Sequence, residues 1–109
     1  MGLFRKQKGP VTDEERRAVL DLATDEDYTL FEVLERFRKD ARHSDPLPIA
    51  RLTVLELLDK KMVEIHTRHP GGKRTLNSAA DAVAAVESAQ AWEPLVADKP
   101  HFACVATDS

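Results

Sequence analysis

Apolar residues recur at helical spacing in two successive segments near the start of the chain, and each segment begins with a capping-box pair. The first helix is expected to start at Thr12 with Glu15 three residues later, and the second at Thr29 with Glu32. The predicted buried stripe of the first helix is Ala18, Val19, Leu22 and Ala23. The predicted stripe of the second is Leu30, Val33, Leu34 and Phe37. The pattern therefore predicts two amphipathic helices packed through these stripes.

A third and more apolar helix is predicted after Asp45-Pro46, because Asp favours the N-cap and Pro the first helical turn. The residues expected to form its buried face are Ile49, Leu52, Leu55 and Leu58, and Val54, Leu57 and Met62 are expected to widen it. The positions expected to face solvent are Arg51, Thr53, Glu56, Asp59 and Lys60. This helix is expected to be clamped between the other two.

In the second half of the chain, the spacing of apolar residues changes from helical spacing to a period of two. Apolar and polar residues alternate over residues 62–68, and residues 101–107 also have the pattern of a short strand. We expect these two segments to pair antiparallel. Between them, residues 69–74 form a basic, turn-rich loop. An alanine-rich helix is predicted from the cap Ser78 to about Trp92. The expected fold is mainly α with a small two-stranded sheet, an α+β domain with a helix inserted between the strands.

Composition and charge limit the number of domains and the class of protein. The chain has 109 residues, 42% of them apolar, which suits one domain over residues 11–109 behind a basic, flexible tail at residues 1–10. The formal charge is −3, yet residues 41–78 carry seven Lys or Arg against four Asp or Glu. A single cysteine, Cys104, fits a reducing compartment, and no apolar run approaches the roughly 20 residues of a membrane span. We expect a cytoplasmic protein without membrane contact.

The leucine-rich helix that runs from Leu52 through Asp59-Lys60-Lys61 into the strand ending near Ile65 resembles the winged helix-turn-helix superfamily. This resemblance implies three helices followed by a β-wing, with the third helix in the DNA major groove. Two departures stand out: the excursion from Gly71 to Pro100 contains a whole helix, and the chain stops soon after the second strand. The segment from Trp92 to Thr107 resembles small bacterial proteins of uncharacterised activity, which gives no activity to transfer.

The resemblance implies duplex DNA as a partner, but Glu56 and Asp59 on the third helix would be repelled by phosphates. The wing loop is the more basic feature, so we expect phosphate contacts there and few base contacts. The candidate DNA-binding residues are Arg51, Lys60, Lys61, Arg68, His69, Lys73 and Arg74. The alternative from the same residues is a protein–protein interaction module that does not bind DNA. A solvated charged loop is the plainest interpretation of the wing.

The alanine-rich helix is a candidate interface with a second copy or a partner protein, because small residues allow close helix approach. The candidate interface residues are Ala82, Val86, Ala89 and Trp92. The competing interpretation is a helix that covers the open edge of the domain. The sequence offers no catalytic constellation, no cofactor motif and no ligand spacing for a metal, and Cys104 beside Phe102 fits an inert core position. We therefore expect a non-enzymatic regulatory or binding protein.

Overall fold

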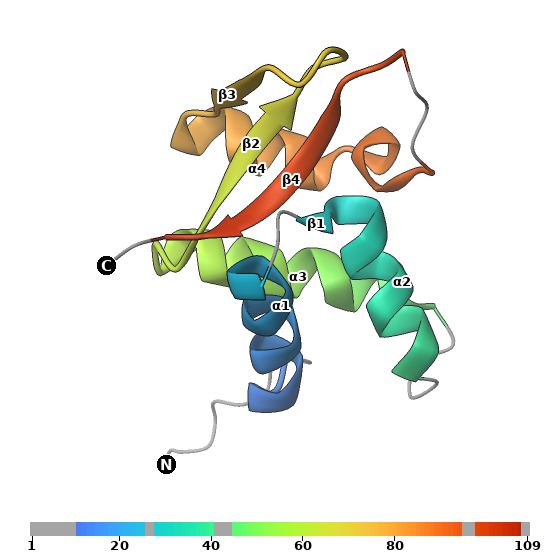
Figure 1. The fold of residues 1–109 in the computed structure, drawn as a ribbon. Helices are drawn as coiled ribbons and strands as arrows, with labels where there is room; N and C mark the ends of the chain where they lie inside the picture. The colour runs from blue at the N-terminus through green and yellow to red at the C-terminus, as the bar shows by residue number, and fades with distance from the viewer. Residues whose placement is uncertain (1–10, 26–27, 41–44, 95–97, 108–109) are drawn as a thin grey trace.

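The computed structural model describes residues 11–25, 28–40, 45–94 and 98–107. It contains an α+β arrangement of helices and a four-stranded antiparallel sheet of order β1-β4-β2-β3. The strands are β1 (Tyr28–Thr29), β2 (Val63–Arg68), β3 (Arg74–Leu76) and β4 (His101–Ala106). The helices are α1 (Asp13–Asp25), α2 (Leu30–Asp40), α3 (Pro46–Asp59), α4 (Ala79–Glu87) and the 3-10 turn η2 (Ala89–Trp92). In Figure 1, α4 lies behind β2 and β4, while α1, α2 and α3 lie below. The expected tail at residues 1–10 lies outside the described residues.

The predicted helix starts are confirmed by their hydrogen bonds. The Thr12 amide donates to the Glu15 carboxylate at 2.8 Å, and the Thr29 amide donates to the Glu32 carboxylate at 2.9 Å. The Asp45 carboxylate caps α3 by accepting from the Leu47 amide at 3.4 Å. These bonds satisfy amide groups that the first turn of a helix leaves without a partner.

The predicted faces of α3 are confirmed at Ile49, Val54 and Leu57 and wrong at Leu52 and Thr53. Thr53, expected to face solvent, is fully buried, and its hydroxyl donates to the Ile49 carbonyl at 2.7 Å. Leu52, expected in the core, is 43% exposed. The buried face consists of Pro46, Ile49, Ala50, Thr53, Val54 and Leu57. A threonine can occupy a core position here because its hydroxyl is satisfied within the helix.

The predicted antiparallel pair of strands is confirmed: β2 and β4 pair from Val63 opposite Ala106 to Arg68 opposite His101. Two strands were missed. β1 pairs with the other side of β4, and β3 lies on the outer side of β2, where only a basic loop was expected. Strands of two and three residues leave too short a pattern of alternation to be recognised in the sequence.

The inserted alanine-rich segment is shorter and more buried than predicted. α4 ends at Glu87, and Ser88 in extended backbone separates it from η2. Ala82, Val86 and Trp92 all belong to the hydrophobic core, which also includes residues of α1, α2, α3 and the sheet. The insertion therefore helps to form the core.

Candidate functional site

The inner and outer faces of the sheet differ in chemistry because side chains alternate along each strand. On the inner face, the buried Val63, Ile65 and Cys104 contact the helices. Burial raises the pKa of the Cys104 thiol to about 12, so this cysteine is an apolar core residue, as predicted. The functional groups of the sheet must therefore be sought on its outer face.

Three cationic or basic side chains form a row across the outer face. Arg68 of β2 stands directly opposite Arg74 of β3 on one side and His101 of β4 on the other. Side chains at directly opposed positions lie about 5 Å apart at their Cβ atoms. The two arginines carry like charges on neighbouring strands, so an anion over the row would be attracted to both.

The turn that joins β2 to β3 extends this row to the end of the sheet. The His69 amide donates to the Lys73 carbonyl at 2.7 Å, and the Gly72 amide donates to the His69 carbonyl at 3.0 Å. Gly71 and Gly72 both have φ of 94°, a conformation that residues with a side chain rarely adopt. The turn is therefore built by glycines, and it presents Lys73 to solvent.

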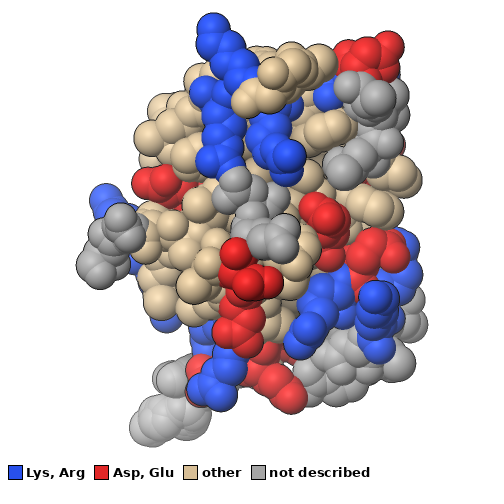
Figure 2. Space-filling model, in the orientation of Figure 1, with Lys and Arg blue, Asp and Glu red and all other residues tan. Residues whose placement is uncertain are grey.

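We call Arg68, Lys73, Arg74 and His101 the basic hairpin surface. Residues 65–80 contain no Asp or Glu, and the carboxylate of Glu64, the acid of β2, lies 3.0 Å from the His66 ring. Figure 2 shows Lys and Arg side chains gathered at the top of the molecule, over the hairpin end of the sheet, with an acidic group at the top right and acidic side chains interleaved with basic ones lower down. On this face, cations are concentrated over the hairpin, although the formal charge of the chain is −3.

His69, the remaining predicted residue of the loop, is half-buried beside this surface. Its Nε2 lies 3.2 Å from the Thr75 hydroxyl, which holds the ring along the hairpin. His101 was missed because no strand register was assigned in the sequence. The predicted pairing of residues 62–68 with 101–107, aligned end to end, would have brought it opposite Arg68.

The predicted residues of α3 and the turn after it do not join the basic hairpin surface. Arg51 is half-buried, and its Nε donates to the Val86 carbonyl of α4 at 3.2 Å. Lys60 contacts Glu56 at 3.3 Å between Nζ and Oε2. Lys61 is exposed in the left-handed conformation with φ of 61°, at the turn that ends α3.

The exposed side of α3 carries apolar and acidic side chains, which do not attract the phosphates of nucleic acid. It presents Pro48, Leu52 and Asp59, with Glu56 at its margin. Glu56 accepts from the Arg16 guanidinium of α1, and this bond is the main cause of a lowered Glu56 pKa. A lowered pKa keeps this carboxylate ionised at neutral pH.

The predicted interface on the inserted helix is wrong at three of its four residues, because these are buried. Ala82, Val86 and Trp92 are each at most 2% exposed, so they cannot meet another molecule in this conformation. Only Ala89 of the predicted set is exposed. The Trp92 indole donates to the Val86 carbonyl at 2.8 Å, the same oxygen that accepts from Arg51. This oxygen links η2, α4 and α3.

Within residues 11–25, 28–40, 45–94 and 98–107, no group of three or more His, Cys, Asp or Glu could hold a metal ion. No described helix is long and apolar enough to cross a membrane. Comparison with protein families, curated proteins and solved structures gives no match.

Proposed function

We propose that this protein is a winged-helix domain that binds duplex DNA through phosphate contacts of its basic hairpin surface. The observation that carries the proposal is the cross-strand row of Arg74, Arg68 and His101. Phosphates are the anions of DNA that such a row fits best, because they recur along the backbone at regular spacing. The contacts position the protein on DNA without distinguishing its sequence.

The winged-helix part of the proposal is supported by element order and sheet order. The order α1-β1-α2-α3-β2, followed after an excursion by β4, has a short strand between the first two helices. β4 returns between β1 and β2, antiparallel to both. β3, α4 and η2 then form an insertion within the wing, where the resemblance in the sequence also placed an unusual segment.

The third helix is not the DNA-contacting element in this proposal. Its one central cation, Arg51, is engaged by the Val86 carbonyl, and its exposed side carries Leu52 and Asp59. Base-edge contacts in the major groove require donors such as Arg, Lys, Asn or Gln at such positions. We therefore place the contact on the hairpin and expect weak dependence on DNA sequence.

The test compares two double variants in fluorescence anisotropy with labelled duplexes of unrelated sequence. Lys73→Gln/Arg74→Gln is expected to weaken binding to every duplex and to reduce the slope of log K against log salt by about 2. The matched control, Arg36→Gln/Lys39→Gln, removes two exposed cations from α2. It is expected to leave the slope unchanged. Absence of binding by the intact protein at about 50 mM salt would overturn the proposal, because non-specific affinity is highest at low salt.

The second candidate is a protein–protein interaction module, and the exposed side of α3 favours it. Leu52, at 43% exposed, is a large apolar side chain flanked by the carboxylates of Glu56 and Asp59. An exposed apolar group with an acidic margin suits a partner helix with apolar and basic residues. Affinity capture from the native cell with the intact protein and with Leu52→Glu tests this candidate. A partner held by the first and lost by the second would favour it, and equal capture would exclude the α3 surface.

A further inference from the structure

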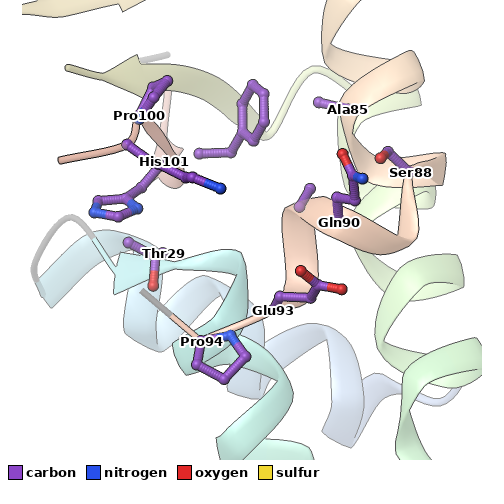
Figure 3. A pocket seen from close by; sticks show the side chains of 11 residues that line it. Thr29, Ala85, Ser88, Gln90, Glu93, Pro94, Pro100 and His101 are labelled. Carbon is purple, nitrogen blue, oxygen red and sulfur yellow. The ribbon is translucent and has the colours of Figure 1, made fainter. Parts of the chain in front are cut away.

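A cavity of about 450 Å³ adjoins the basic hairpin surface, between η2 and the start of β4. His101 belongs to both, because it ends the cross-strand row and also lines the cavity. Figure 3 shows His101 and Pro100 on one wall of the cavity, with Ser88, Gln90 and Glu93 on the other. Cavities of this size accommodate small organic groups. The row of basic side chains therefore leads into a site that phosphate contacts on the row leave unused.

The cavity begins where β1 stops. β1 pairs Tyr28 with Cys104 and Thr29 with Ala103, and Thr29 lines the cavity. The next residue, Leu30, already starts α2, so the chain turns into a helix and does not continue as a strand alongside His101. The cavity thus takes the place in which a longer β1 would extend the row by one more strand.

The lining combines apolar surface with groups that donate and accept hydrogen bonds. Ala85, Ala91 and the half-buried Phe102 provide the apolar part. The Ser88 hydroxyl and the Gln90 amide each offer a donor and an acceptor, and the Ser88 hydroxyl makes no capping bond to η2. A flat group with apolar faces and a polar edge matches this lining.

The charged residues of the lining lie on different sides. Lys99 and His101 come from the β4 side, where His101 stands opposite Arg68, and Glu93 comes from the η2 side. An anion beside Lys99 and His101 would continue the path of anions along the row. A nucleotide combines such an anion with a flat base that has apolar faces and a polar edge.

We propose that the cavity binds an unpaired nucleotide at the end of a DNA duplex whose phosphates lie on the basic hairpin surface. The base packs against Phe102 and Ala91, its edge bonds to Gln90, and its phosphate lies beside Lys99 and His101. A paired base would first have to leave its stack, at a cost that an unpaired base avoids. The inference rests on the proposed function and adds a preference for DNA ends with a single-stranded overhang.

The test is fluorescence anisotropy of the intact protein with three labelled DNA probes. One is a blunt duplex, the second carries three unpaired nucleotides at one end, and the third carries three abasic nucleotides there. The abasic overhang has the same phosphates without bases, so it controls for charge. The probe with bases is expected to bind about tenfold more tightly than the abasic probe, with the overhang at the 3′ or at the 5′ end, which is the effect of stacking one base.

Two variants assign this preference to the cavity. Gln90→Ala removes the amide that bonds to the base edge, and Phe102→Leu removes the aromatic ring but keeps an apolar side chain. Each is expected to reduce the preference about fivefold without changing the affinity for the blunt duplex. The control Ala89→Ser changes an exposed neighbour of Gln90 outside the cavity lining and is expected to leave the preference unchanged.

The side-chain amide resonance of Gln90 gives a second readout in the intact protein. It is expected to shift with the base-containing overhang and to stay in place with the abasic one. Equal binding of the two overhangs, a preference that both cavity variants leave unchanged, or an unmoved Gln90 resonance overturns this inference, while binding of the blunt duplex leaves the DNA-binding proposal standing. Absence of binding by every probe at about 50 mM salt overturns both.

Discussion

At the scale of single residues, Glu56 joins α1 to α3. It accepts from the Arg16 guanidinium, with Nη2 and Oε1 3.4 Å apart, and from Lys60. The hydrogen bond from Arg16 lowers the pKa of Glu56 below its ordinary value of 4.5. A carboxylate with a lowered folded-state pKa stabilises the fold above its unfolded pKa, and this contribution is lost as the pH falls through the folded pKa.

Glu56→Gln is therefore expected to lower the free energy of unfolding at pH 7 by about 0.5 kcal/mol, since both partners keep some contact with solvent. The difference from the intact protein should shrink as the pH falls below 4.5. Urea unfolding at several pH values measures this, with Asp59→Asn as the control on the same helix. A difference that stays constant down to pH 2 would contradict the assigned role of the ion pair.

Lys61 adopts the left-handed conformation with φ of 61° at the end of α3. Its amide donates to the Leu58 carbonyl, and the Met62 amide donates to the Leu57 carbonyl, the pair of bonds of a Schellman motif. Glycine suits this position better than lysine, so Lys61→Gly should raise the free energy of unfolding by about 0.5–1 kcal/mol. Thermal unfolding checks this, and a destabilised variant would contradict the conformation.

At the scale of elements, the sequence predicted helix starts well and helix orientation less well. Capping-box pairs at Thr12 and Thr29 are local, so the residues that make them are sufficient to identify them. The buried side of α3 depends on what covers it. The insertion packs on this helix and binds Arg51, while Leu52 lies outside the contact. Periodicity alone could not distinguish these sides, because leucine stands at 52, 55, 57 and 58.

The orientation of α3 is testable with two substitutions of the same chemistry. Leu57 is fully buried, so Leu57→Ala should lower the free energy of unfolding by about 3 kcal/mol through lost contacts and a cavity. Leu52 is 43% exposed, so Leu52→Ala should lower the free energy of unfolding by less than about 1 kcal/mol. Chemical denaturation of both variants makes the comparison. Equal losses, or the reverse order, would show that α3 is rotated from the orientation described.

At the scale of the whole molecule, the insertion and the three helices share one core. Val86 and Trp92 from the insertion belong to the same buried cluster as Val54 and Leu57 of α3 and Ile65 of β2. The alanine-rich composition predicted a helix but could not show that it is a core element, because burial arises from contacts with segments distant in the sequence. The basic loop was predicted as the binding site, but the row across three strands requires the register of the sheet.

This shared core predicts cooperative unfolding. Trp92 is the single tryptophan of the chain and lies in η2, so its fluorescence reports on the packing of the insertion against the core. Far-ultraviolet circular dichroism reports mainly on all the helices. The two signals are expected to change at the same urea concentration. An earlier loss of the Trp92 signal would show that the insertion unfolds independently and does not complete the core.

In the function that we propose, DNA contacts the hairpin and leaves α3 free. Nuclear magnetic resonance titration of the labelled protein with a short duplex at low salt distinguishes these two surfaces. We expect shifts for the amides of Arg68, Lys73, Arg74 and His101, with those of Leu52 and Asp59 unmoved. Shifts concentrated on α3 with an unmoved hairpin, or no shifts at all, would contradict it.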